Sequence, residues 1–220
     1  MDNRTILSAV DHTLLDPAAA WEQIRTVCDE GLYYRTATVC IPQNYVRQAA
    51  DYLAGRLPVC TVIGFPTGSQ TTAVKCAEAA DAVKNGAAEL DMVVPLGWVK
   101  ERRYAEVTRQ IRAVKEAGDG RTLKVILETC RLTREEKTAL CEVVSDAGAD
   151  FIKTSTGFSA GGATREDVAL LVQHAAPGVR VKAAGGIRSL EDAAAFLELG
   201  ASRLGTSAVV RLIKEKEMTV

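Results

Sequence analysis

Short apolar stretches alternate with longer amphipathic stretches along the 220-residue chain, and this alternation constrains the fold more than any other feature. The short stretches have the length of buried strands, and the intervening stretches begin at helix-capping residues and end at glycine. Eight strands alternating with helices predict a single-domain (β/α)8 barrel over residues 1–220, with a doubly wound open sheet as the competing architecture. The expected strands lie at about residues 6–10, 36–40, 58–63, 89–94, 122–127, 151–153, 179–182 and 202–204.

Several expected helices carry recognisable boundary signals. Asp16 followed by Pro17 has the form of an N-cap and a first helical residue, so we expect a helix from there to Gly31. One long helix is expected over residues 98–117. Thr133 and Glu136 have the spacing of a capping box, in which each side chain accepts a hydrogen bond from the other residue's backbone.

A weak internal repeat places residues from different strands in one register. A Gly-Ala pair ends a helix and begins a strand three times, at residues 86, 148 and 200. The fifth residue after each glycine is Asp91, Lys153 and Gly205, respectively. Alternate strands of a (β/α)8 barrel contribute side chains to the same interior layer. The repeat therefore predicts that Asp91 and Lys153 point into one cavity.

Composition disfavours several classes of function. A net charge of −1 gives no general basic surface, so nucleic acid is not an expected partner. We find neither a signal peptide nor a long apolar run, so no membrane partner is expected and the cytoplasm is the expected location. The six cysteines form no C-x-x-C pair and the chain has two histidines, which favours free thiols and a reaction without a metal or other cofactor.

Two lysines that end short apolar strands are the strongest chemical signal. Lys153 follows Phe151-Ile152 and Lys182 follows Val181, on strands expected to be neighbours. Neighbouring strands lie about 4.8 Å apart, and two ammonium groups about 4 Å apart repel by about 4 kcal/mol at an effective dielectric constant near 20. This repulsion lowers the pKa of one lysine from about 10.4 to about 7.5. Because a neutral amine attacks carbonyl carbon, the pair predicts Schiff-base chemistry with an aldehyde or ketone.

Each of these residues also has a purely structural interpretation. A single strand-end lysine would more often pair with a carboxylate such as Asp91 or Glu128, whereas two lysines on adjacent strands favour catalysis. Asp91 itself could cap backbone amides, or could position a hydroxyl group and move a proton. The electrostatic argument alone does not decide which lysine is the nucleophile.

Glycine turns after the last three expected strands form a second constellation. They are Thr156-Gly157, Gly185-Gly186-Ile187-Arg188 and Gly205-Thr206-Ser207. Exposed backbone amides and helix N-termini bind phosphate, and the loops after strands seven and eight are the usual phosphate site of this barrel. Together the turns predict a phosphorylated substrate.

Three further polar residues lie at expected strand ends. Asp11 and His12 follow the first expected strand, where they could bind substrate. Cys40 ends the second, but no histidine is placed to activate its thiol. We interpret Cys40 as a small buried core residue.

At these motifs the chain resembles the deoxyribose-phosphate aldolases of the short bacterial type. The resemblance runs from Asp11-His12-Thr13-Leu14-Leu15 through residues 89–93 to Arg203-Leu204-Gly205-Thr206-Ser207, and so covers nearly the whole chain. Its most specific segments are Phe151-Ile152-Lys153-Thr154-Ser155-Thr156-Gly157 and residues 181–188. It implies a class I aldolase that cleaves 2-deoxyribose 5-phosphate into acetaldehyde and glyceraldehyde 3-phosphate.

The resemblance also implies roles for individual residues. Lys153 is expected to form the Schiff base, Lys182 to keep Lys153 neutral, and Asp91 to belong to the proton relay. The expected substrate-binding residues are Asp11, Thr156, Gly157, Gly185, Gly186, Arg188, Gly205, Thr206 and Ser207.

One departure from the family and several alternatives accompany this interpretation. Some family members end in a tail with a terminal tyrosine tied to proton exchange, whereas residues 214–220 contain no tyrosine, which puts a tail-assisted proton step in doubt. The alternative functions are a Schiff-base aldolase for another sugar phosphate, an isomerase, and a non-catalytic sugar-phosphate sensor. Association into a homodimer or homotetramer is left open.

Overall fold

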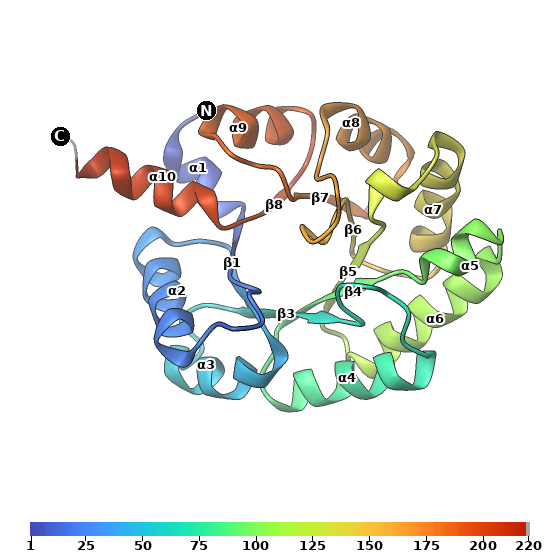
Figure 1. Ribbon diagram of the computed structural model, residues 1–220, viewed down its shortest axis with the longest axis horizontal. Helices are drawn as coiled ribbons and strands as arrows, with labels where there is room; N and C mark the ends of the chain where they lie inside the picture. Colours follow the sequence, from blue (N-terminus) through green and yellow to red (C-terminus); the bar gives the residue numbers. More distant parts are fainter. Residues whose placement is uncertain (219–220) are drawn as a thin grey trace.

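The eight strands of the chain form a closed parallel barrel in which the strands neighbour one another in sequence order (Figure 1). This computed structural model describes residues 1–218, and the last two residues of the tyrosine-free end lie outside the described residues. The predicted (β/α)8 barrel is confirmed and the open sheet is wrong. The strands are β1 (Val10–Thr13), β2 (Thr38–Ile41), β3 (Val59–Ile63), β4 (Glu89–Val93), β5 (Thr122–Ile126), β6 (Phe151–Lys153), β7 (Arg180–Ala184) and β8 (Arg203–Thr206).

The helices surround the barrel, and α1 and α10 pack together on one side of it (Figure 1). Short 3₁₀ turns follow β2 at Gln43–Tyr45 and β5 at Thr129–Arg131. The helices are α1 (Asn3–Ser8), α2 (Trp21–Tyr34), α3 (Val46–Leu53), α4 (Thr72–Lys84), α5 (Leu96–Lys100), α6 (Tyr104–Ala117), α7 (Arg134–Asp146), α8 (Arg165–His174), α9 (Leu190–Glu198) and α10 (Ala208–Glu217). Among residues 1–218, none of these helices combines the length and the apolar character needed to cross a bilayer.

The first part of the chain differs from its expected pattern. Residues 6–8, expected in a strand, belong to α1, whose N-cap Asp2 accepts a hydrogen bond from the Thr5 amide (2.8 Å). Asp11 therefore lies inside β1 rather than after it. Asp16 is not a helix cap, because its carboxylate accepts from the Ala18 amide (2.8 Å) in a turn and α2 begins only at Trp21. The Asp-Pro signal marks this turn correctly but places the helix too early.

Three further differences concern helices whose ends carry no sequence signal. The single helix expected over residues 98–117 is divided into α5 and α6 by Arg102, which has a left-handed backbone (φ 57°) that ends a helix. Helix α2 runs past Gly31 to Tyr34. Gly31 does not end the helix; it allows close packing, because a Cβ at this position would lie 2.7 Å from the Leu57 side chain. The eight-residue helix α3 was not predicted.

Side-chain caps are present at the start of three later helices. Thr133 and Glu136 form the expected capping box at the start of α7. Thr164 accepts from the Asp167 amide (3.1 Å) at α8, and Ser189 accepts from the Asp192 amide (3.0 Å) at α9. These bonds fix where each helix begins, and hence where the preceding loop meets the barrel rim.

The barrel has an apolar layer outside its strands and a polar interior. Outward-facing strand residues such as Leu90, Met92 and Ile152 pack with the helices in one large buried cluster. Each side chain of this size contributes about 1.5–3 kcal/mol when it is fully buried. Because strand residues alternate between faces, the same alternation turns Asp91 and Lys153 toward the barrel axis. The apolar outer layer thus stabilises a frame whose inside is free for chemistry.

A buried lysine holds the loop between β3 and α4 against the barrel. The Lys75 ammonium is fully buried and donates to the Gly68 carbonyl (2.7 Å), the Val93 carbonyl (2.7 Å) and the Gln110 side-chain oxygen (2.8 Å). Burial lowers the pKa of Lys75 to about 8. Its three acceptors are neutral and lie on the loop, on β4 and on α6, so one side chain links three separate segments.

Replacing Lys75 with methionine tests this link. The Lys75→Met variant keeps the apolar stem but leaves buried acceptors unsatisfied, so the free energy of unfolding should fall by about 2–4 kcal/mol. Urea unfolding followed by circular dichroism measures the change. The matched control is Lys84→Met, at an exposed position in the last turn of the same helix, which should change stability by no more than about 0.5 kcal/mol. Equal stability of the two variants would contradict the role given to Lys75.

Candidate active site

Seven ionisable side chains meet inside the barrel. They come from six of the eight strands, and each points from its strand toward the barrel axis, where opposite charges are joined by ion pairs of 3.6 Å or less. Burying charges in this way is costly unless each is paired and hydrogen-bonded. The members of this interior charge cluster are Asp11, Glu89, Asp91, Lys124, Lys153, Lys182 and Arg203.

Asp91 is the centre of the interior charge cluster. Its Oδ2 accepts from the ammonium groups of Lys153 (2.7 Å) and Lys182 (2.7 Å), and its Oδ1 accepts from Lys124 (2.9 Å). Burial alone would raise the pKa of Asp91, but the three lysines outweigh burial and hold that pKa well below its usual value. Asp91 therefore remains a carboxylate, and it contacts Lys153 in the barrel interior although it does not itself line the cavity described below.

Lys182 is bound from both sides by carboxylates. Its ammonium donates to Asp91 and also to Asp11, and Lys153 and Lys182 are directly opposite each other in the ladder between β6 and β7. Burial alone would lower the pKa of Lys182, whereas Asp11 and Asp91 raise it well above its usual value. Lys182 therefore stays charged. The structural interpretation, in which a strand-end lysine pairs with Asp91, holds for both Lys153 and Lys182.

The charges of the cluster are unequal in number. Its three carboxylates are matched by Lys124, Lys182 and Arg203, and Lys153 is the fourth cation. The cluster therefore holds one more cation than it has carboxylates, and the hydrogen bond with Asp91 fixes the position of the Lys153 amine.

A cavity of about 580 Å³ opens at the carboxyl ends of the strands, above the interior charge cluster. Lys153 is the only member of the cluster among the described residues that line it, and it is 3% exposed, whereas Lys182 is fully buried. Most of the predicted substrate-binding residues also line this cavity. They are Thr156, Gly157, Gly185, Gly186, Gly205, Thr206 and Ser207.

Other predicted residues lie elsewhere. Asp11 is fully buried below the cavity, where it accepts from Thr38 Oγ1 (2.8 Å) and Arg203 (2.6 Å). Arg188 is exposed and does not line the cavity. His12 faces away from the barrel axis and bonds Glu30 (2.9 Å), because the residue after Asp11 must point to the opposite face of the strand. The expectation that His12 follows the strand and reaches substrate is therefore wrong.

Glu128 orders the turn that follows Lys153. It was considered as a lysine partner, but its carboxylate instead accepts from the Thr156 amide (3.3 Å) and from the Thr156 hydroxyl. Glu128 has a left-handed backbone (φ 58°), which is uncommon for a residue other than glycine. This conformation brings the carboxylate back over the end of β6, so that the turn at residues 156–157 lies against the cavity.

Three members of the interior charge cluster were missed by sequence reasoning. Lys124 lies opposite Asp91 in the ladder between β4 and β5, and Arg203 lies opposite Lys182 between β7 and β8. Glu89 forms ion pairs with both Lys124 (2.5 Å) and Arg203 (3.0 Å). A signal was present, because each of these charged residues lies within or begins an otherwise apolar strand segment. These three residues were missed because only the carboxyl ends of the expected strands were considered as positions for site residues.

Gly205 provides the space that Lys182 needs. A Cβ at position 205 would lie 3.0 Å from Lys182 Cε and 3.0 Å from Ala184 Cβ. Gly205, which shares a register with Asp91 and Lys153, therefore has no side chain in the interior. The long stem of Lys182 occupies the volume that a side chain at position 205 would fill.

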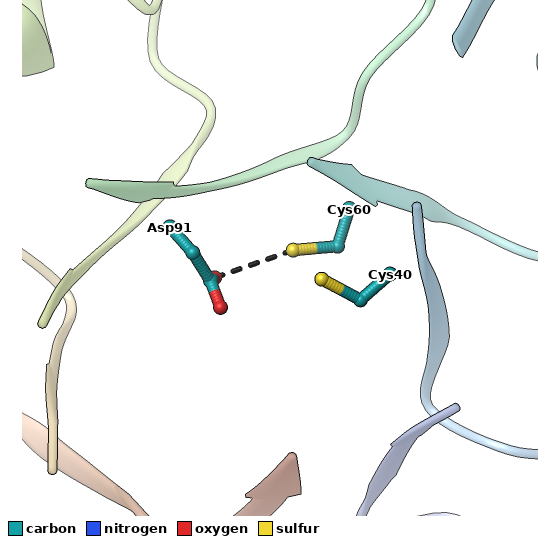
Figure 2. Close-up of side chains that lie close together, drawn as sticks. All are labelled: Cys40, Cys60 and Asp91. Carbon is teal, nitrogen blue, oxygen red and sulfur yellow. Dashed lines mark hydrogen bonds between the residues drawn. The ribbon is translucent and has the colours of Figure 1, made fainter. Parts of the chain in front are cut away.

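Two cysteines on neighbouring strands complete the surroundings of Asp91. Figure 2 shows Cys40 and Cys60 beside each other, with the Cys60 thiol donating to Asp91 Oδ1 (3.2 Å). Cys40 is buried, as predicted. Cys40, Cys60 and Asp91 have ligand atoms within 4.8 Å of one another, as do Asp11, Cys60 and Glu89. The carboxylates of both groups are already bound by lysine or arginine side chains, which oppose a further cation.

The sequence and the fold both match known proteins. The family described as DeoC/LacD family aldolase matches residues 5–209. Curated proteins named deoxyribose-phosphate aldolase from Streptococcus agalactiae and Streptococcus pyogenes are each 53% identical, over 99% and 98% of this chain and 98% and 97% of theirs. A tetrameric deoxyribose phosphate aldolase from Aeropyrum pernix superposes with a TM-score of 0.88 at 33% identity, covering all of this chain and 94% of that one.

These matches cover the whole barrel. The family match spans every strand from β1 to β8 and therefore includes all seven members of the interior charge cluster. The barrel, the cluster and the sequence thus agree: the chain belongs to the DeoC/LacD family of aldolases.

Proposed function

We propose that this protein is a deoxyribose-phosphate aldolase, which reversibly cleaves 2-deoxyribose 5-phosphate into acetaldehyde and glyceraldehyde 3-phosphate. One observation carries the proposal: Lys153 alone of the cluster lysines lines the cavity, with its amine 2.7 Å from Asp91. The names of the streptococcal relatives and their full-length identity support the choice of substrate. The reaction class is that of a carbon–carbon lyase acting through a lysine imine.

Lys153 is the nucleophile in this proposal. Its uncharged amine attacks the C1 aldehyde of the open-chain sugar, and loss of water gives an iminium ion. Lys182 cannot take this role, because two carboxylates keep it protonated and it does not reach the cavity. Lys182 instead lies beside Asp91 as the neighbouring ammonium group.

The iminium ion then draws electrons from the bond that breaks. Removal of the proton from the C3 hydroxyl group allows the C2–C3 bond to cleave, and the electron pair moves into an enamine on Lys153. Glyceraldehyde 3-phosphate leaves, the enamine gains a proton at carbon, and water releases acetaldehyde. Asp91, as the carboxylate nearest to Lys153, and Lys182, as the adjacent acid, are the groups that relay these protons through water.

The other end of the cavity suits the phosphate group. Gly185, Gly186 and residues 205–207 line it, and Ser207 precedes the first turn of the ten-residue helix α10. Amide groups of glycine turns and the positive end of a helix dipole bind phosphate without a metal ion. The sugar would thus lie with its aldehyde at Lys153 and its phosphate near the start of α10.

The expected setting of the enzyme belongs to the same proposal. All six cysteines are free, which supports the reducing cytoplasm as its location. We also propose that residues 1–220 act as one barrel domain and associate into a homo-oligomer. The tetrameric relative from Aeropyrum pernix supports association.

Trapping the imine tests the nucleophile. Incubation with acetaldehyde and sodium borohydride should add one ethyl group to each chain, and peptide mass spectrometry should locate it on Lys153. The Lys153→Ala variant should remain unmodified at the same reagent concentration. Lys84→Ala, at an exposed position on α4, is the control and should be labelled like the unaltered protein. Full labelling of Lys153→Ala would refute the assignment.

Removing the charge of Asp91 tests the relay. The Asp91→Asn variant should lose about 100- to 10,000-fold in kcat for deoxyribose 5-phosphate cleavage, because a proton acceptor is lost and Lys153 loses its charged partner. An acetaldehyde assay measures turnover, and circular dichroism verifies the fold. Asp119→Asn, at an exposed turn, should retain full turnover. A kcat within threefold of the unaltered enzyme would exclude Asp91 from the chemistry.

A carboxylate placed beside the proposed phosphate site tests the substrate orientation. Ser207→Glu should raise KM for deoxyribose 5-phosphate at least about tenfold, because about 1.4 kcal/mol of repulsion corresponds to that factor. Borohydride trapping with acetaldehyde, which lacks phosphate, should be unchanged. Ser202→Glu introduces the same charge at an exposed position before β8 and should leave KM unaltered. An equal response of both variants would contradict this orientation.

A further inference from the structure

Cys40 and Cys60 lie directly opposite each other on the neighbouring parallel strands β2 and β3 (Figure 2). Strands in a sheet are about 4.8 Å apart, which falls inside the range of Cα separations, about 4.4–6.8 Å, that a disulfide can join. Both side chains point toward the barrel axis, and their sulfur atoms lie within 4.8 Å of each other and of an Asp91 oxygen. The two thiols therefore need little movement to form a bond.

Charged side chains lie close to the pair. The Lys124 ammonium contacts the Cys60 sulfur (3.4 Å), and Lys153 and Lys182 lie on the other side of Asp91. The neighbouring Cys60 side chain lowers the pKa of Cys40 despite its burial, whereas burial raises the pKa of Cys60 well above its usual value. One thiol of the pair is thus prepared to ionise while the other retains its proton. This division of roles suits an attacking and a resolving cysteine.

A small reagent has a short path to the sulfur atoms. Cys40 and Cys60 form a small buried cluster with Val62, against which Leu15 and Phe65 pack. These three apolar residues also line a second cavity of about 400 Å³ beside the cavity of Lys153. The thiols and this cavity thus share the same three apolar neighbours.

We propose that Cys40 and Cys60 form a redox-sensitive pair, which a peroxide converts into a disulfide that reversibly lowers turnover at Lys153. The Cys40 thiolate attacks one oxygen of hydrogen peroxide, so that the O–O bond breaks and a sulfenic acid and hydroxide form. The Cys60 sulfur then attacks the Cys40 sulfur, its proton leaves with the displaced hydroxide as water, and an S–S bond results. The pair loses two electrons and the peroxide gains them.

The disulfide would act on the catalytic lysine through Asp91. A disulfide has no S–H group, so Asp91 Oδ1 would lose the hydrogen bond that Cys60 now donates. Closing the S–S bond also draws the Cys60 sulfur toward Cys40 and away from Lys124. The position of the carboxylate that holds Lys153 is thereby altered, and turnover should fall without any modification of Lys153 itself.

The side chains of Cys40, Cys60 and Asp91 do not favour a metal ion. Asp91 is already bound by Lys124, Lys153 and Lys182, and their positive charges would repel a divalent cation placed between Asp91 and the sulfurs. Disulfide formation adds no charge to the interior. The geometry therefore points to oxidation rather than to metal binding.

Mass spectrometry of the peroxide-treated enzyme tests the proposal. Treatment should join the peptides that contain Cys40 and Cys60, and dithiothreitol should separate them again. The measurement uses no substrate, so it remains informative even if the proposed sugar is wrong. Linked peptides would support the pair, whereas oxidised but unlinked Cys40 would overturn it.

Activity measurements then connect the disulfide to the site. Each protein is compared with its own untreated sample, and we expect peroxide to lower kcat of the unaltered enzyme at least fivefold, with recovery in dithiothreitol. Cys40→Ala and Cys60→Ala should lose this recoverable inhibition. Cys28→Ala and Cys141→Ala, which remove buried thiols on α2 and α7, should retain it. Recoverable inhibition that persists in Cys40→Ala, or linked peptides without any change in kcat, would refute the regulatory role.

Discussion

The carboxylate of Asp91, bound by three ammonium groups, is the interaction on which the arrangement of the barrel interior depends. Without it, Lys124, Lys153 and Lys182 would be like charges enclosed together, and each would favour losing a proton or leaving the interior. With it, two lysines remain charged and paired, and the third stands at the base of the cavity. Asp91 thus holds three chemically identical amines together, and of these three only Lys153 lines the cavity.

The fold supports this selection by separating two kinds of burial. Apolar residues on the outer face of the strands pack against the helices, and stabilise the barrel independently of its contents. The inner face is then available for charges that would weaken an ordinary core. The arrangement of the interior also depends on available space, because Gly205 has no side chain where the stem of Lys182 passes. Stability and reactivity consequently depend on opposite faces of the same strands.

Sequence reasoning recovered the barrel and the central pair, and its errors have physical explanations. The Gly-Ala repeat predicted that Asp91 and Lys153 share a cavity, because register propagates faithfully along parallel strands. Lys124, Glu89 and Arg203 were missed because they lie within or at the start of their strands, and the Asp11 partner of Arg203 comes next to it only when β1 pairs with β8. The break at Arg102 was missed as well, because its left-handed backbone is imposed by packing and no glycine announces it. Asp11 was expected after the first strand because residues 6–8 were assigned to that strand. These residues belong to α1, and Asp11 therefore lies inside β1.

The ion pairs of the interior also bear on how such a chain folds. Asp11, near the start of the chain, bonds Lys182 and Arg203, which are 171 and 192 residues away. The last strands must therefore be synthesised and in place before the first strand can bury its charge. While strands are missing, these charges have no partners, and burying an unpaired charge is costly. The barrel is therefore expected to stay open to water until all strands are present. Closure of the barrel and assembly of the lysine site are for this reason expected to occur as a single cooperative event.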